Sequence, residues 1–180
     1  MLQKKAHKMD AELNEIQLAC FTLGDKLFAV DIMRIREILL PQKLASLPRS
    51  SDVLDGVINL RGTVIPVMNL RKRFGMPAES SGKNGKLLIV SLVKQQLALM
   101  VDDVMEVITV PVKDINPPLQ TVSDVGMEFV VGVCLSGDRV FMILNIDALL
   151  SLQEFPDTAR KTQRVISAES NPIVSGVVRQ

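Results

Sequence analysis

The chain has 180 residues, a net charge of +1 and a hydrophobic fraction of 47%. This length suits one large domain or two small ones, and the hydrophobic fraction predicts a packed core rather than a disordered chain. The balanced charge gives no electrostatic reason to expect nucleic acid or an anionic membrane as the partner. No apolar run approaches the ~18–20 residues that cross a bilayer, and the charged segment 1–15 is unlike a signal peptide, so we expect a cytoplasmic protein without direct membrane insertion.

Residue types that hold metals or perform catalysis are scarce. Cys20 and Cys134 each lie in an apolar segment that predicts a strand, so both are expected to be buried. His7 is the single histidine and lies in the charged N-terminal segment, where nothing would orient it. Asp102 and Asp103 lie at the end of a predicted strand and are interpreted as solvated surface acids or turn formers. With no P-loop or nucleophile elbow either, we expect no catalytic residue, no metal, no cofactor and no enzyme activity.

The first predicted element after the polar N-terminal tail, residues 1–16, is a β-hairpin. Residues 17–23 and 26–32 alternate in character on either side of a turn at residues 24–25. The apolar residues between Ile32 and Leu39 then follow a helical spacing, which predicts a short helix or an irregular turn.

Further short strands follow in the first half. Residues 43–47 lie between two prolines and predict one strand, and residues 57–60 and 63–69 predict two more around a tight turn at Arg61 and Gly62. Pro66 cannot donate a ladder hydrogen bond, which indicates an edge strand or a bulge.

The segment 76–85 is rich in Gly, Ser and mixed charge and predicts a domain boundary, after which the order of elements begins again. Two shifts of the sequence against itself align Leu18 with Leu87, Glu37 with Glu106, Gly56 with Gly132, and Asn69 with Asn145. The two halves therefore share one plan.

Each half offers short strands and few helices, which predicts an all-β fold. A few short strands cannot bury much as an open sheet, so we expect two small β-barrels that pack on each other and share a core. The expected subdomains are 17–75 and 86–150, which together form one unit, 17–150, followed by a tail over 151–180.

The most unusual segment is 56–67, in which two glycines allow sharp turns on either side of a strand. Arg61 lies on the second turn, where an arginine held by an acid can be presented to a partner. A second hypothesis is a single-stranded nucleic-acid-binding barrel that uses the basic cluster 71–73. The chain has no Trp or Tyr for base stacking, so we expect no nucleic acid and interpret 71–73 as a solvated helix face.

Three segments, 21–39, 56–75 and 130–150, closely resemble CheW-like domains in the same order. The resemblance spans 17–150. It implies two five-stranded SH3-like β-barrels around a shared hydrophobic core.

The resemblance also implies a function. CheW-like adaptors couple chemoreceptors to a histidine kinase, so the implied partners are the helical hairpin at the chemoreceptor cytoplasmic tip and the regulatory domain of the kinase CheA, in membrane-associated arrays. An adaptor of a related pathway that controls pili or development is the alternative. The resemblance implies these partner-binding residues: Ile35, Glu37, Gly56, Asn59, Leu60, Arg61 and Gly62. We expect Glu37 and Arg61 to pair.

The chain departs from the family pattern at Asn69, where family members usually have Asp. The loss of this charge is expected to leave the fold intact and to put a local ion pair in doubt.

Overall fold

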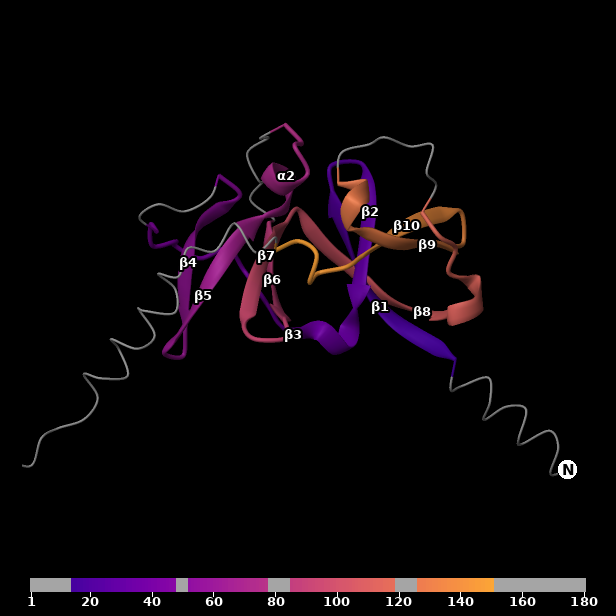
Figure 1. The fold of residues 1–180 in the computed structure, drawn as a ribbon, viewed down its shortest axis with the longest axis horizontal. Helices are drawn as coiled ribbons and strands as arrows, with labels where there is room; N and C mark the ends of the chain where they lie inside the picture. The colour runs from indigo at the N-terminus through magenta and orange to yellow at the C-terminus, as the bar shows by residue number, and fades with distance from the viewer. Residues whose placement is uncertain (1–13, 48–51, 78–84, 119–125, 151–180) are drawn as a thin grey trace, which may run out of the picture.

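The computed structural model describes residues 14–47, 52–77, 85–118 and 126–150. The expected C-terminal tail, most of the expected linker and nearly all of the N-terminal tail lie outside these residues; residues 15 and 16 already belong to the first strand. The described strands form two five-stranded sheets, which confirms a mainly β fold. The two sheets lie side by side (Figure 1).

The first sheet has the order β8-β1-β2-β10-β9 and the second sheet the order β3-β6-β7-β5-β4. The first sheet comprises β1 (Glu15–Leu23), β2 (Lys26–Asp31), β8 (Asp103–Pro111), β9 (Val130–Ser136) and β10 (Arg139–Leu144). The second comprises β3 (Ile35–Leu39), β4 (Leu54–Leu60), β5 (Thr63–Asn69), β6 (Lys86–Ser91) and β7 (Gln96–Val101). The short helices are η1 (Ile32–Arg34), α2 (Leu70–Arg73), η2 (Val112–Asp114) and η3 (Met127–Phe129).

Each sheet contains strands from both halves of the chain. The hairpin β1–β2 pairs with β8 on one side and, in parallel, with β10 on the other. The equivalent hairpin β6–β7 pairs in the same way with β3 and β5. The sheets therefore differ from the expected consecutive subdomains, 17–75 and 86–150, because each half gives its hairpin to the other half's sheet.

The segment that follows one edge strand reaches across to the other edge in both sheets. Ala45, after β3, exchanges two backbone hydrogen bonds with Val57 of β4, both 2.9 Å long. Asn116, after β8 and η2, exchanges two with Val133 of β9, both 2.8 Å long. These bridges join the edges of each sheet, as the expected closure into small barrels requires.

Among the described residues, the core has three parts, of which the largest lies between the sheets. It joins Phe21 and Phe28 of the first sheet with Leu88 of the second and with Phe74 after α2. Of the two smaller clusters, one fills the interior of the first sheet and the other the interior of the second. This arrangement confirms the shared core.

The arrangement explains why β1 and β6 are apolar on both faces. In β6, Leu87 and Ile89 face the interior of the second sheet, whereas Leu88 and Val90 join the shared core. In β1, side chains alternate in the same way between the first-sheet interior, which also contains both cysteines, and the shared core.

Three local predictions need correction. Only Ile32–Arg34 is helical after β2, because the backbone is extended from Ile35 and β3 pairs with β6. The strand predicted at 43–47 is reduced to the bridge at Ala45. Pro66 lies in an inner strand, not an edge strand, next to the bulge that shifts the register between Leu54 and Gly56. Its partner Val57 directs both of its own backbone groups to Ala45.

Candidate functional site: an ion pair on the β4–β5 turn

The turn between β4 and β5 presents Arg61 outward. Arg61 has φ 52° and Gly62 has φ 86°, so both central residues are left-handed, as in the tight turns that match the twist of a hairpin. The side chain of Asn59 accepts a hydrogen bond of 2.8 Å from the Gly62 amide, which stabilises the turn. The tight turn predicted at Arg61 and Gly62 is confirmed.

Arg61 forms an ion pair with Glu37 of β3. Its Nη2 atom lies 2.8 Å from Oε1 and 3.0 Å from Oε2 of Glu37. The Arg61 side chain is 76% exposed and the Glu37 side chain 29% exposed. An exposed pair contributes only ~0–1 kcal/mol to folding, so this pair orients the guanidinium more than it stabilises the chain.

The other residues of the predicted site serve the fold around this pair. Leu60 is partly buried and packs against the second-sheet interior, and Ile35 is partly buried against the shared core. Gly56 lies at the far end of β4, where a Cβ atom would come within 2.5 Å of the Ala45 oxygen. The structure therefore gathers Glu37, Arg61 and the turn residues, and places Gly56 apart from them.

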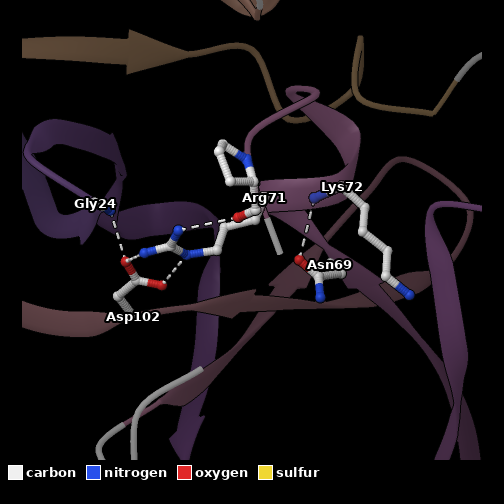
Figure 2. A network of polar contacts seen from close by, with 6 residues as sticks. Gly24, Asn69, Arg71, Lys72 and Asp102 are labelled. Atoms are coloured by element: carbon white, nitrogen blue, oxygen red, sulfur yellow. Dashed lines mark hydrogen bonds and ion pairs between the residues drawn. The ribbon is translucent and has the colours of Figure 1, made fainter. Parts of the chain in front are cut away.

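A second polar network was not predicted from the sequence. Figure 2 shows Arg71 of α2 extended toward Asp102, with Nε 2.7 Å from Oδ1 and Nη2 2.5 Å from Oδ2. The Gly24 amide donates to the same carboxylate at 2.6 Å. Asp102 and Arg71 were both interpreted as solvated, and this is wrong, because their side chains are 22% and 11% exposed. Asp102 and Asp103 are far from the basic segment 71–73 in the sequence, so nothing in the sequence indicated that either acid would pair with Arg71.

The environment of Asp102 alters its proton affinity. Burial alone would raise its pKa, but the hydrogen bonds from Arg71 and from the Gly24 amide, with the charge of Arg71, hold the pKa below its ordinary value of 3.8. The carboxylate is therefore charged at neutral pH and remains paired.

Arg73 was likewise interpreted as solvated, yet its guanidinium carbon lies 4.6 Å from the centre of the Phe129 ring.

Comparison with known proteins identifies the family. The model of the CheW-like domain matches residues 17–154. The chemotaxis protein CheW of Treponema pallidum is 32% identical over 149 residues, which cover 81% of this chain and 88% of that protein. CheW of Helicobacter pylori is 33% identical, with 75% and 81% covered. The crystal structure of the scaffolding protein TtCheW from Thermoanaerobacter tengcongensis superposes with a TM-score of 0.71 at 30% identity, with 78% and 90% covered.

The chain belongs to the CheW-like domain family. Family membership confirms the predicted fold of two SH3-like subdomains. It also makes the chain a chemotaxis coupling adaptor, a scaffold rather than an enzyme. Within the described residues, no group of His, Cys, Asp and Glu side chains could hold a metal ion.

The departure from the CheW-like pattern at Asn69 has a structural context. Asn69 Oδ1 accepts from the Lys72 amide at 3.3 Å and so caps α2, while its Nδ2 atom donates to Asp55 Oδ2 at 2.9 Å. Lys72 Nζ pairs with the other oxygen of Asp55 at 2.5 Å. The acid of this local ion pair is therefore supplied by Asp55, and the amide of Asn69 bonds to it without repulsion.

The repeat contains a counterpart of the Glu37–Arg61 pair. Glu106 aligns with Glu37, and it pairs with Arg139, at the start of β10, at 2.5 Å. Both CheW-like subdomains therefore carry a glutamate on an edge strand that holds an arginine from the closing hairpin.

Proposed function

We propose that this CheW-like chain binds the helical hairpin at the cytoplasmic tip of a chemoreceptor through the surface around Glu37 and Arg61, and binds the regulatory domain of the kinase CheA through a different surface. It would then act in the cytoplasm, within receptor arrays at the membrane. Among the described residues, no helix is both long and apolar enough to cross a bilayer.

The ion pair between Glu37 and Arg61 is the observation that carries the receptor assignment. It holds the guanidinium in one orientation while leaving most of it in contact with solvent. Exposed apolar side chains follow both elements of the pair, with Ile38 46% exposed in β3 and Val64 41% exposed in β5. The helical hairpin of a receptor offers polar groups to bind such an arginine and apolar side chains to pack on Ile38 and Val64.

Exposed apolar side chains of the first sheet support a separate kinase surface. They occur on three of its strands, and those with the highest exposed fractions are Val107, Val131, Leu135 and Val140. The last three lie on the neighbouring strands β9 and β10, and apolar side chains this exposed on adjacent strands are typical of protein contacts. Such individual contacts would be small, so the multivalency of an array would make them effective.

Two alternatives are less well supported. An adaptor of a pathway for pili or development would use the same surfaces, but the relatives are named as chemotaxis proteins. A single-stranded nucleic-acid-binding barrel needs exposed aromatic rings. The described phenylalanines are all buried: Phe21, Phe28, Phe74, Phe129 and Phe141.

The test is co-sedimentation of the full chain with receptor-containing membranes and with CheA. We expect Arg61→Ala and Glu37→Ala to weaken receptor binding by about tenfold, the effect of about 1.4 kcal/mol, and to leave CheA binding intact. Arg139→Ala is the matched control, because it removes the equivalent ion pair from the first sheet and should retain receptor binding. Receptor binding at wild-type strength by both test variants, or an equal loss in Arg139→Ala, would contradict the assignment.

A further inference from the structure

The chain passes between the two sheets at two places in the described residues. It leaves the first sheet after β2 and enters β3 through η1. It returns after β7 and enters β8 through the single residue Asp102. The placement of one sheet against the other depends on the conformation of these two short crossings, as well as on the shared core.

The second crossing is held by the buried pair of Asp102 and Arg71. The backbone amide of Asp102 donates to Thr22 of β1 at 3.1 Å, and its carboxylate accepts from the amide of Gly24, in the β1–β2 turn. Arg71 approaches from α2, which follows β5 of the second sheet. It also donates to the Pro77 carbonyl at 3.3 Å. One carboxylate therefore connects both sheets and the crossing between them.

The first crossing is held by Arg34 and Asp147. Arg34 is the last residue of η1, and its Nη2 atom lies 2.6 Å from Asp147 Oδ2. Asp147 lies in the turn that follows β10 of the first sheet, and its amide donates to the Asn145 side chain at 3.1 Å. This pair is more exposed than the other, at 33% and 44% of the two side chains.

The internal repeat relates the two pairs. The shift that aligns Asn69 with Asn145 also places Arg71 on Asp147. Both asparagines accept a backbone hydrogen bond just after the second strand of a hairpin, Asn69 after β4–β5 and Asn145 after β9–β10. In both cases, therefore, the second residue after the asparagine pairs with a crossing, but the charges are exchanged: a base reaches an acidic crossing in one case, and an acid reaches a basic crossing in the other.

We propose that these two ion pairs are clasps that position the two sheets relative to each other, and that simultaneous use of the receptor and kinase surfaces depends on them. The second part rests on the proposed function. The base and the acid have exchanged places between the two pairs. This indicates that the ion pair with the crossing matters, and not which of its two members carries the positive charge. Because Arg71–Asp102 is largely buried, its loss leaves a charge without compensation and disturbs folding. Arg34–Asp147 is exposed enough to be altered without unfolding the chain.

The test uses the full chain and the exposed clasp. Arg34→Gln and Asp147→Asn each remove the pair, and the double variant Arg34→Asp with Asp147→Arg restores it with the polarity of the other clasp. Lys72→Gln is the matched control, because it breaks a similar exposed ion pair with Asp55 that lies within one sheet. Asp102→Asn examines the buried clasp while retaining an acceptor for the Gly24 amide.

The first measurement is hydrogen exchange at the Ile35 amide, which donates to the Ile32 carbonyl at the end of η1. We expect about tenfold faster exchange in Arg34→Gln and Asp147→Asn, and near wild-type exchange in the double variant and in Lys72→Gln. Exchange at the wild-type rate in both single variants would overturn the clasp, whether or not any partner binds.

The second measurement compares binding of each partner alone with kinase stimulation in the ternary complex. We expect affinities for receptor membranes and for CheA to stay within about twofold of wild type, while stimulation falls by about fivefold and returns in the double variant. Faster exchange with unchanged stimulation, or an equal loss in Lys72→Gln, would overturn the functional part. A wild-type chain that binds neither partner would contradict the proposed function and leave the exchange result to decide the clasp.

Discussion

Gly56 and Gly132 occupy equivalent positions in the two sheets, each directly beside the segment that bridges the sheet edges. A Cβ atom on Gly56 would lie 2.5 Å from the Ala45 oxygen, and one on Gly132 would lie 2.6 Å from Cγ2 of Ile115. Both contacts are too close for a side chain. The first is with rigid backbone, and the second is with the β-branch methyl of Ile115, beside the Asn116 oxygen at 3.2 Å.

This difference predicts an order of stability for two matched variants. Gly56→Ala also places a side chain at φ 149°, so we expect it to lower the free energy of unfolding by about 3 kcal/mol. Gly132→Ala should cost less, about 2 kcal/mol, because Gly132 has no left-handed backbone and its closest contact is a side-chain methyl rather than backbone. Urea unfolding measures both values, and Gly137→Ala controls for the strain of a positive φ without a clash, because Gly137 has φ 61° and open space around its Cβ position. Equal costs at Gly56 and Gly132 would contradict the role of the Ala45 bridge.

The lowered pKa of Asp102 predicts a dependence of stability on acid. The folded state holds this carboxylate ionised beside Arg71 more strongly than the unfolded chain does. Its contribution is therefore present above the unfolded pKa of about 3.9 and is lost as the pH falls through the lower folded pKa. Asp102→Asn should lower the free energy of unfolding by about 2 kcal/mol at pH 7 and by much less at pH 2. Unfolding curves at the two pH values measure this, and a cost independent of pH would show that the charge is unimportant.

The cysteines predict a slow reaction with thiol reagents. Burial, with a smaller contribution from the neighbouring Cys134, raises the pKa of Cys20 to about 12, and burial also raises the pKa of the Cys134 thiol. Neither thiol should react at pH 8 with a disulfide reagent such as dithionitrobenzoate until the first sheet opens. The labelling rate should rise with urea in parallel with unfolding. Rapid labelling of the native chain would contradict the packed interior of the first sheet.

The hydrogen bond between Asn69 and Asp55 predicts that a change at Asn69 can be compensated by a change at Asp55. In the wild-type chain, Asp55 accepts a hydrogen bond from the side-chain amide of Asn69. Asn69→Asp replaces that amide by a second carboxylate next to Asp55. We expect a loss of about 1 kcal/mol at pH 7, reduced by Lys72, which remains near both acids. The double variant Asn69→Asp with Asp55→Asn should recover most of it, because the acid and amide exchange places. Thermal unfolding of the wild type, Asn69→Asp, Asp55→Asn and the double variant measures the coupling, and additive costs would show that the two side chains act independently.

Local pattern was enough to predict several features. Alternation and turn residues predicted the β1–β2 and β4–β5 hairpins, and the repeat predicted two similar units with a shared core. The Glu37–Arg61 pair followed from the family resemblance and is present. Turn geometry is encoded within a few residues, so these features needed no knowledge of the rest of the chain.

The sequence alone determined two equivalent units, their hairpins and the family to which they belong. Only the tertiary structure decided which hairpin pairs with which half, since β1–β2 and β6–β7 have the same pattern and either could complete either sheet. The same is true of Arg71 and Asp102, because a partly buried ion pair between distant residues depends on where the crossings lead. Short-range pattern specifies strands and turns, whereas the choice among equivalent long-range pairings depends on packing of the complete chain.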